Sequence, residues 1–450
     1  MIDLSPDLIA QGLGVEVVQE GGPGGPARAS IDSRALEPGD LFFGLPGERV
    51  DGGEFAGQAL EAGAWGVVVT PERAAELVGG ERVGWIFSTP DPLNALQGLA
   101  TAWRRQLGVP VLGITGSVGK TSVKDIARAI LPGRVHANEQ NLNTEIGLPL
   151  TILSAPRDTD LLVLEMAMRG FGQIALLAEV AEPNVGVITC VEPVHVELVG
   201  SVEGVAKAKA ELIDGLPGDG TLVAQADPGL LAPHLDRAPS LITFGDGGDV
   251  FADGDGVEVS DGSLAATVHT PAGKERFSFP FSERHNLENA LAAIAAGIAL
   301  GFSPAEMSAG TGRIRLSSLR GERVELPGGA VLINDCYNAN PVSMRAALGN
   351  LSSEPAESRI AVLGLMGELG EEAEAYHSEV GEIAREAGID LVIGVGPEAA
   401  GYRPDVLVDD PAGAAAELSG RDRPGTVVLV KGSRSAGLEA VAQALTGKAD

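Results

Sequence analysis

The sequence is poor in cysteine, in positive charge and in long apolar runs, and each shortage excludes a class of protein. Only Cys190 and Cys336 are cysteines among 450 residues, and each lies in a strand-like run. Two thiols so far apart in the chain give no support for a disulfide framework or for a cysteine-based metal cluster.

Positive charge is scarce throughout the chain. Acidic residues outnumber basic ones by 62 to 32, which gives a formal net charge of -30. A protein that binds nucleic acid needs a basic face, and no basic cluster occurs, so we expect no nucleic-acid partner. Any site for an anion must therefore be built locally from lysines, arginines and helix N-termini.

Long apolar runs are also missing. The longest mainly apolar stretch, around 287–302, is rich in alanine and too short to span a bilayer. The N-terminal segment MIDLSPDLIAQGLG has neither the basic start nor the apolar core of a signal peptide. We therefore expect a soluble, cytoplasmic monomer with no membrane insertion.

The length and the order of patterns indicate several α/β domains, since one core rarely serves 450 residues. Strand-like and helix-like runs alternate through most of the chain, which is typical of parallel sheets covered by helices. We place the domains at 1–92, 93–311 and 312–450. Within the second, residues 241–281 carry short strands split by DG and GG turns and predict an antiparallel insertion.

The segment VLGITGSVGKTSVKDIARAIL, starting at Val111, carries the strongest chemical signal. An apolar strand runs into a glycine-rich turn whose N–H groups can surround phosphate oxygens, and a helix follows. Lys120 would place a charge on the outer phosphates and the hydroxyl of Thr121 would bind Mg²⁺. Only two residues separate Gly116 from Gly119, fewer than the usual four, so an ordinary glycine-rich turn stays as an alternative. The predicted nucleotide-binding set is Thr115, Gly116, Ser117, Val118, Gly119, Lys120, Thr121 and Ser122.

Two further candidates follow strands of the same predicted sheet. Glu165 ends the strand DLLVLEM and His195 follows the strand NVGVITCV. Ligands gather at the carboxyl ends of parallel strands, and a carboxylate there can hold Mg²⁺ beside phosphates. A chance acidic residue and a structural histidine are the plain alternatives.

The helix that begins near Val202 contains an unusual lysine. Lys207 lies four residues after Glu203 and is expected in solvent. Lys209 instead shares its helical stripe with Val205 and Leu212, on the face that should pack inward. A buried lysine is costly unless it is paired, modified or functional; a lysine that extends to solvent is the alternative.

Several motifs together resemble the ATP-dependent Mur ligases of peptidoglycan synthesis, and the resemblance covers essentially the whole chain. The segments that carry it are DSR (32–34), TGSVGKTS (115–122), NLNTEIGLPL (141–150), LEMAM (164–168), HVELVGSVEGVAKAKAELI (195–213), RHNLENALAA (284–293), NDCYNANPVSM (334–344) and VKGSRSAGLE (430–439). The resemblance implies a three-domain α/β architecture, with a central P-loop parallel sheet and a C-terminal Rossmann-like domain. The YNANP form is similar to the branch that joins D-alanyl-D-alanine to UDP-N-acetylmuramoyl-tripeptide.

The resemblance also implies roles for individual residues, with ATP and two Mg²⁺ sites as cofactors. Glu165 and His195 would serve the metal sites with Thr121, and Lys209 would carry a carboxylate derived from CO₂ that binds the second Mg²⁺. Arg320 would contact phosphate, although Arg315 and Arg323 are close enough in the sequence to compete for that role. Further nucleotide contacts would be Asn286, Asn289 and Asp335. Substrate contacts would be Ser33, Arg34, Asn143, Thr144, Asn338, Asn340, Lys431 and Arg434.

Plainer interpretations remain for many of these residues. Asn286 and Asn289 could cap a helix, Ser33 and Arg34 could form a surface turn, and Asn340 before Pro341 has the form of an N-cap. The sequence also departs from the family at Leu365, where an acidic residue is usual, and at Gly367, where a larger one is common.

Three functions stay open at this point. The first is the ligase just described, which would form an amide through an acyl phosphate. The second is a sibling ligase that adds a single amino acid. The third is a P-loop switch protein, against which the inward Lys209 argues, because a switch needs no second metal site. A non-catalytic scaffold is disfavoured by the intact phosphate loop.

Overall fold

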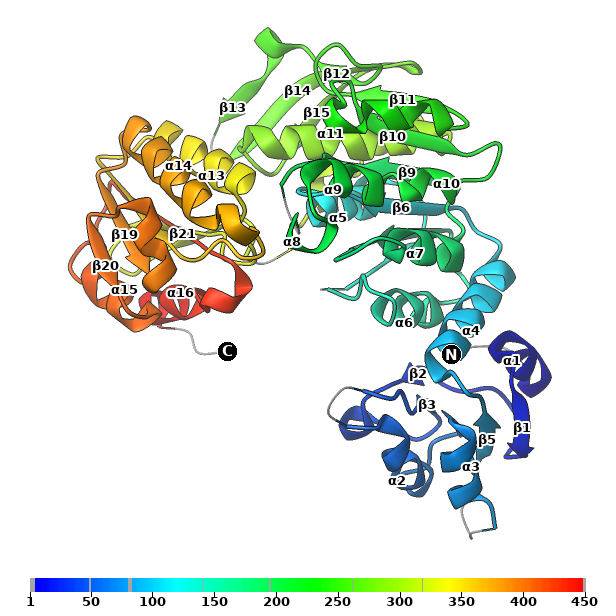
Figure 1. Ribbon diagram of the computed structural model, residues 1–450. Helices are drawn as coiled ribbons and strands as arrows, with labels where there is room; N and C mark the ends of the chain where they lie inside the picture. The colour runs from blue at the N-terminus through cyan, green and yellow to red at the C-terminus, as the bar shows by residue number, and fades with distance from the viewer. Residues whose placement is uncertain are drawn as a thin grey trace.

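The computed structural model describes residues 5–47, 50–79, 83–139, 141–193, 196–260, 262–317 and 319–447. Within this part of the chain, three sheets of mainly parallel strands follow one another, each with its own helices (Figure 1). The blue N-terminal part and the orange C-terminal part lie on either side of the green central part in this view. The α/β class expected from the sequence is confirmed, while the domain boundaries remain predictions.

The first part contains a sheet with the strand order β1-β5-β4-β3-β2, in which β1 alone runs antiparallel to its neighbour. The apolar runs LFFGL (41–45) and WGVVVT (65–70) predict strands, and they form β3 and β4. The elements are α1 (Pro6–Leu13), β1 (Glu16–Gln19), β2 (Ala29–Ser30), η1 (Ser33–Ala35), β3 (Leu41–Phe43), η2 (Gly52–Phe55), α2 (Ala56–Glu61), β4 (Gly66–Val69), α3 (Pro71–Leu77) and β5 (Trp85–Ser88).

The central sheet has the order β11-β10-β9-β6-β8-β7, and all of its pairs are parallel. Strand β6 lies in its interior and is buried along its whole length. The elements are α4 (Pro92–Leu107), β6 (Val111–Thr115), α5 (Lys120–Ile130), β7 (Val135–Ala137), α6 (Gly147–Ser154), β8 (Leu161–Glu165), α7 (Gln173–Ala181), β9 (Val185–Ile188), α8 (Val196–Val199), α9 (Val202–Lys209), α10 (Glu211–Asp214), β10 (Thr221–Gln225), η3 (Gly229–Arg237), β11 (Leu241–Phe244), α11 (Arg284–Ala299), α12 (Pro304–Ser308) and η5 (Thr311–Arg313).

The predicted antiparallel insertion is correct except at its start. Strands β12 (Phe251–Ala252), β13 (Glu258–Ser260), β14 (Ser263–Thr270) and β15 (Gly273–Phe279) form an antiparallel sheet around β14, and η4 (Gly254–Gly256) lies between two of them. Strand β11 was expected in this insertion, but it pairs in parallel with β10 and extends the central sheet. The prediction for 241–244 was wrong because a short apolar run does not indicate which strand it pairs with, or whether that pairing is parallel or antiparallel.

The third part has the sheet order β16-β17-β21-β18-β19-β20, parallel except for β16 at its edge. The runs AVLIND, RIAVLGL, DLVIGVG, DVLVDD and TVVLVKG predict five strands, and they form β17 to β21. Strand β16 was missed because three of its four residues are charged, as in a loop. The elements are β16 (Glu322–Glu325), β17 (Val331–Asn334), α13 (Pro341–Ser353), β18 (Ser358–Leu363), η6 (Gly370–Glu372), α14 (Ala373–Glu386), β19 (Leu391–Val395), η7 (Pro397–Tyr402), β20 (Val406–Val408), α15 (Pro411–Leu418), β21 (Thr426–Lys431), η8 (Arg434–Ala436) and α16 (Glu439–Thr446).

Helix α5 is buried more completely than its sequence predicted. The spacing of Val123, Ile126, Ala127 and Ile130 indicated one inward face, but the structure also buries Lys124 and Asp125. The helix packs against strands β6, β7 and β8 on one side and against α11 on another, so two faces are covered instead of one. Across the described residues, no helix is long and apolar enough to cross a membrane.

Candidate active site

The phosphate loop connects β6 to α5 at the carboxyl edge of the central sheet. Its two glycines adopt backbone angles that other residues rarely take, with φ of 148° at Gly116 and 86° at Gly119. A Cβ at Gly116 would lie 1.9 Å from Oγ1 of Thr189, and one at Gly119 would lie 2.3 Å from Oδ1 of Asn289. The sequence therefore needs glycine at both positions, for backbone conformation and for space.

The loop is hydrogen-bonded to the residues that follow the two neighbouring strands, β8 and β9. The backbone N–H of Ser117 donates to the carbonyl of Cys190 at 2.9 Å, and the N–H of Glu192 donates to Oγ of Ser117 at 2.9 Å. Oγ1 of Thr115 donates to the carbonyl of Met166 at 2.9 Å. These contacts fix the loop without using the backbone N–H groups at the start of α5, which stay available to an anion.

Lys120 begins α5, as predicted, and its ammonium folds back over the loop. Nζ donates to the carbonyls of Gly116 at 2.8 Å and Ser117 at 3.3 Å. Burial lowers the pKa of Lys120, while the nearby carboxylate of Glu165 raises it. The half-buried ammonium is held at the loop by these two carbonyls, where it could interact electrostatically with phosphate.

Glu165 is the centre of a buried hydrogen-bonded group. It ends β8 with an exposed fraction of 2%. Oγ1 of Thr121 donates to Oε2 of Glu165 at 2.8 Å, and Nδ2 of Asn143 donates to Oε1 at 2.8 Å. The structure thus brings together three residues that the sequence singled out separately. A hydroxyl and a carboxylate are hard oxygen donors, so this pair fits Mg²⁺.

Lys209 ends α9 and is buried, with an exposed fraction of 2%. Burial holds the pKa of Lys209 well below its usual range, and the nearby charge of Lys120 lowers it further. The inward orientation expected from the helical stripe is confirmed, whereas Lys207 is exposed and lies 5.5 Å from the ring centre of Phe171. His195 lies outside the described residues. Among those described, no group of three or more histidine, cysteine or acidic side chains is placed to hold a metal ion.

Asn286 and Asn289 lie on the first turns of α11. Nδ2 of Asn289 donates to Oδ1 of Asn286 at 3.2 Å, and Asn289 contacts the phosphate loop at Gly119. Glu283 is the residue at the N-cap position of α11, so the alternative that the asparagines cap the helix is wrong. Their place beside the loop supports a contact with nucleotide, which stays a prediction.

The three candidate arginines of the third part differ in their contacts. Arg315 donates to the carbonyls of Gly312 and Ile314, and Arg323 forms an ion pair with Glu354. The guanidinium carbon of Arg320 lies 4.2 Å from the ring centre of Tyr337.

The charge of Arg320 also contributes to the lowered pKa of Lys120. Of the three arginines, Arg320 alone appears among the charges that act on Lys120. This favours Arg320 as the arginine that faces the loop.

The third part contributes a second polar group. Nζ of Lys431, at the end of β21, forms an ion pair with Oδ2 of Asp335 at 2.6 Å and donates to the carbonyl of Asn338 at 3.1 Å. Both Asp335 and Lys431 act on the pKa of His285 on α11, which burial lowers. The group therefore lies close to the start of α11 in the central part.

The remaining predicted contacts are used locally or exposed. Asn340 caps α13 by accepting from the N–H of Ser343 at 2.9 Å, so its capping alternative is confirmed. Oγ1 of Thr144 accepts from the N–H of Gly147 at 3.4 Å. Arg434 is 60% exposed beside Glu439.

The two departures from the family lie in one loop. The carbonyl of Leu365 accepts from the N–H of Ser433 at 2.8 Å, and Gly367 donates to Oγ of Ser433 at 2.8 Å. A Cβ at Gly367 would lie 3.5 Å from that oxygen, an ordinary contact. The loop therefore keeps its backbone contacts despite the changed side chains.

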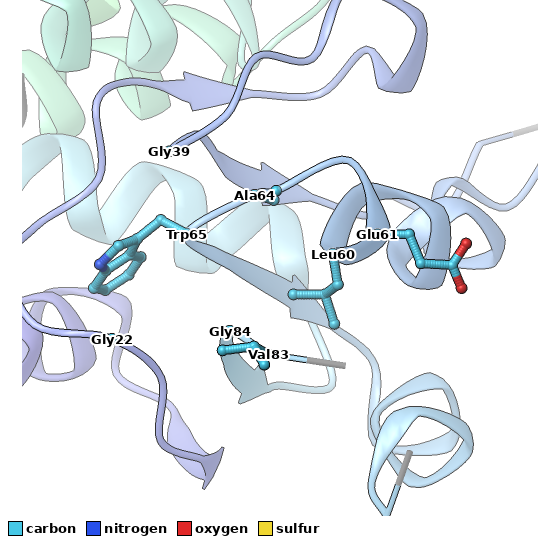
Figure 2. Close-up of a pocket in the computed structure, with 9 residues that line it drawn as sticks. Gly22, Gly39, Leu60, Glu61, Ala64, Trp65, Val83 and Gly84 are labelled. Carbon is cyan, nitrogen blue, oxygen red and sulfur yellow. The ribbon is translucent and has the colours of Figure 1, made fainter. Parts of the chain in front are cut away.

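Ser33 and Arg34 lie in a surface turn of the first part. Arg34 has an exposed side-chain fraction of 88% and pairs with Asp32 at 2.9 Å. They follow β2, at the carboxyl edge of the first sheet. A cavity of about 740 Å³ lies at the opposite edge, where Trp65 and Gly84 precede strands β4 and β5 (Figure 2). That cavity contains none of the predicted substrate residues.

Sequence reasoning missed Asn138, which organises the buried group around Glu165. Oδ1 of Asn138 accepts from the N–H of Glu165 at 2.6 Å, and Nδ2 donates to the carbonyl of Leu142. Its exposed fraction is 1%. A lone asparagine after a short strand gives no signal in one sequence. Lys124 and Asp125 gave no clear signal either, because the same helix carries the exposed charge of Arg128.

Comparison with known proteins agrees with this geometry. Three family profiles match the chain: "Mur ligase family, catalytic domain" at 28–96, "Mur ligase middle domain" at 114–297 and "Mur ligase, glutamate ligase domain" at 319–434. The chain belongs to the Mur ligase family. The profile for the middle domain begins in β6 and ends in α11, so it encloses the phosphate loop, Glu165 and Lys209.

This Mur ligase resembles relatives over nearly its full length. It is 38% identical to UDP-N-acetylmuramoyl-tripeptide–D-alanyl-D-alanine ligase of Synechocystis, covering 92% of this chain and 90% of that protein. The ligase of the same name from Escherichia coli is 34% identical, covering 92% and 93%.

Among solved structures, MurF from Acinetobacter baumannii matches with a TM-score of 0.90 at 26% identity over 100% of both chains. MurF from Thermotoga maritima, in complex with ADP, matches with a TM-score of 0.82 at 28% identity, covering 93% and 97%.

Proposed function

We propose that this Mur ligase joins D-alanyl-D-alanine to UDP-N-acetylmuramoyl-tripeptide in the cytoplasm, with ATP as the energy source. The observation that carries the proposal is the buried group at the phosphate loop, where Lys120, Thr121 and Glu165 lie together. The choice of substrates rests on relatives of that name and on the YNANP motif at 337–341.

The reaction would proceed in two steps. A carboxylate oxygen of the tripeptide attacks the γ-phosphorus of ATP, which forms an acyl phosphate and releases ADP. The amine of D-alanyl-D-alanine then attacks the acyl carbon, loses a proton, and phosphate leaves as the amide forms. Lys120 would stabilise the charge that develops on the transferred phosphoryl group. Water must be kept away, because an acyl phosphate hydrolyses.

Thr121 and Glu165 would hold Mg²⁺ at this site, and the ion would neutralise phosphate charge when bound. Asn143 would orient the carboxylate through its hydrogen bond to Oε1 of Glu165. Arg320 would approach the phosphates from the third part of the chain.

Lys209 would serve a second Mg²⁺ site as its carbamate, together with His195. The support is chemical: a lysine with a lowered pKa holds more neutral amine, which is the form that attacks CO₂. Carboxylation would then replace the buried amine by an anion that a metal ion can pair with.

The deciding experiment measures ADP release with ATP, Mg²⁺ and UDP-N-acetylmuramoyl-tripeptide, comparing D-alanyl-D-alanine with single amino acids. Release that needs the dipeptide, with a product heavier by one dehydrated dipeptide, supports the proposal. Release with a single amino acid would indicate a sibling ligase. Release without any acceptor would indicate a nucleotide switch.

A further inference from the structure

The chain passes from the central part to the third part through a short linker. Ile314 and Leu316 pack against the core beside the central sheet, and Leu319 packs against a core of the third sheet. Leu319 has a φ of 62°, in the left-handed region that leucine rarely adopts. The change of domain therefore takes place within a few residues, between Leu316 and Leu319.

Helix α5 holds this linker on its central side. Oδ2 of Asp125 accepts two hydrogen bonds from Ser317, from the N–H at 2.8 Å and from Oγ at 2.7 Å. The side chain of Asp125 is only 8% exposed. Asp125 lies five residues after Lys120 on the same helix, so one rigid element carries both the phosphate loop and the contact to the linker.

The second carboxylate oxygen of Asp125 is paired with Lys124. Nζ of Lys124 lies 3.2 Å from Oδ1 of Asp125 and donates to the carbonyl of Asn138 at 3.0 Å. Asn138 accepts from the backbone N–H of Glu165. A buried ion pair with such additional hydrogen bonds has a defined geometry, and here it joins the linker to the strand end that carries Glu165.

The other end of the linker is held by the third part. The N–H of Tyr337 donates to the carbonyl of Leu319 at 3.2 Å, and Arg320 stacks on the Tyr337 ring. Arg320 lies three positions after Ser317, a distance of at most roughly 11 Å along the chain. The contact at Ser317 therefore limits how far Arg320 can move from α5.

We propose that Asp125 is a positioning residue for phosphoryl transfer, because its grip on Ser317 fixes the distance between Arg320 and the phosphate loop. The inference rests on the proposed function. The side chain of Asp125 is bound by Lys124 and Ser317, neither of which is a predicted substrate contact, so it would act through the linker. A displacement of about 1 Å at a reacting group can lower the rate about 100-fold. An anchor that prevents such a displacement would offset the free-energy cost of burying the carboxylate of Asp125.

The test uses the full chain with the substitutions Ser317→Ala, Ser317→Thr and Asp125→Asn. Ser317→Ala removes one of the two hydrogen bonds, whereas Ser317→Thr keeps both. Asp249→Asn is the matched control, because Oδ2 of Asp249 accepts from the N–H and Oγ1 of Thr243 at 2.8 Å each, away from the linker.

We expect Ser317→Ala to lower kcat about tenfold and Asp125→Asn between tenfold and 100-fold. The KM for ATP should stay within twofold in both, because the loop is intact. Ser317→Thr should restore most of kcat, and Asp249→Asn should leave it unchanged. The proposal is overturned if kcat stays within twofold of wild type in Ser317→Ala and Asp125→Asn. It is also overturned if the loss of kcat is explained by a lower melting temperature, that is, by partial unfolding of the variant.

A second measurement does not depend on turnover. Spin labels at the exposed positions Lys274 and Glu417 report the distance between the central and third parts. Ser317→Ala should broaden the distribution of this distance and Ser317→Thr should not; equal distributions would overturn the anchor. A wild-type chain without acceptor-dependent ADP release would contradict the proposed function instead, and the label distances would still test the anchor.

Discussion

The phosphate site of the central part and the Ser33–Arg34 turn of the first part are built in opposite ways. At the phosphate site, Thr121 and Glu165 are buried and already hydrogen-bonded to one another. At the turn, Arg34 is 88% exposed and its ion pair is with Asp32, two residues away in the chain. The hydrogen-bonded group of one site lies within the central part and is buried, whereas the other site presents an exposed arginine to solvent.

This difference indicates how the two substrates would be held. A buried, prearranged site loses little freedom when ligand binds, and it strengthens electrostatic interactions with phosphate. An exposed arginine must be ordered on binding and is screened by salt. We therefore expect changes at the phosphate site to affect turnover, and changes at the turn to affect only the affinity for the nucleotide-linked peptide.

Replacing Lys120 should give the largest effect. Lys120→Ala removes the charge above the loop and should lower kcat on the order of 100- to 1000-fold. Lys207→Ala is the control, because Lys207 is an exposed lysine in the same part of the chain. Measurement of ADP release checks both variants; turnover within tenfold of wild type in Lys120→Ala would remove Lys120 from the mechanism.

Replacing Lys209 tests the second buried lysine. Lys209→Ala should lose on the order of 100-fold in kcat, as expected for a lost metal ligand. Added formate or acetate should recover part of the activity, since a small carboxylate can take the place of the carbamate. Lys207→Ala should show neither loss nor recovery. Full activity of Lys209→Ala without added carboxylate would exclude the carbamate.

Crowding the loop should break the prearranged site while leaving Lys120, Thr121 and Glu165 in place. Gly119→Ala combines a strained φ of 86° with a Cβ 2.3 Å from Asn289. Gly108→Ala is the matched control, with a φ of 64° and its nearest neighbour 3.9 Å away.

The control should cost about 1–2 kcal/mol in the free energy of unfolding through strain alone. Gly119→Ala should cost about 1–3 kcal/mol more through overpacking and should also weaken ATP binding. Urea unfolding and ATP titration measure these effects. Equal losses of stability in the two variants would show that Asn289 moves aside readily.

Replacing the exposed arginine should have a smaller effect of a different kind. Arg34→Ala should raise the KM for UDP-N-acetylmuramoyl-tripeptide by roughly 3- to 30-fold, less than a buried charge-assisted hydrogen bond contributes, because Arg34 is exposed and screened by salt. At saturating substrate kcat should not change. Arg276→Ala, another exposed arginine with an acidic partner, should leave both constants unchanged. A fall in kcat in Arg34→Ala would contradict the division of roles between the two sites.

The smallest expected effect concerns pH. The hydrogen bonds from Arg34 lower the pKa of Asp32 to about 2, from an ordinary value of 3.8. A carboxyl group with a lowered pKa keeps its ion pair above the ordinary value and loses it as the pH falls through about 2. The ratio of KM between wild type and Arg34→Ala should therefore be constant from pH 5 to pH 8. A ratio that changes in this range would show that another titrating group shares the site.

Local patterns predicted much of the fold and the centre of the site. The strand, glycine turn and helix around Lys120 were predictable because backbone angles and helical period act over a few residues. The inward stripe of Lys209 and the N-cap at Asn340 were predictable for the same reason. The orientation of β11, the edge strand β16 and the second buried face of α5 were not, because each depends on a partner elsewhere in the chain.

The sequence by itself determined that a phosphate loop, a carboxylate at a strand end and a buried lysine would occur, since each follows from residues close together in the chain. Only the tertiary structure decided that Glu165 bonds both Thr121 and Asn143, that the charge of Arg320 acts on Lys120, and that Asp125 holds Ser317. The residues of these contacts lie between 22 and 200 positions apart. Which side chains meet over such separations is set by sheet order and by the packing of whole helices, and no local pattern encodes either.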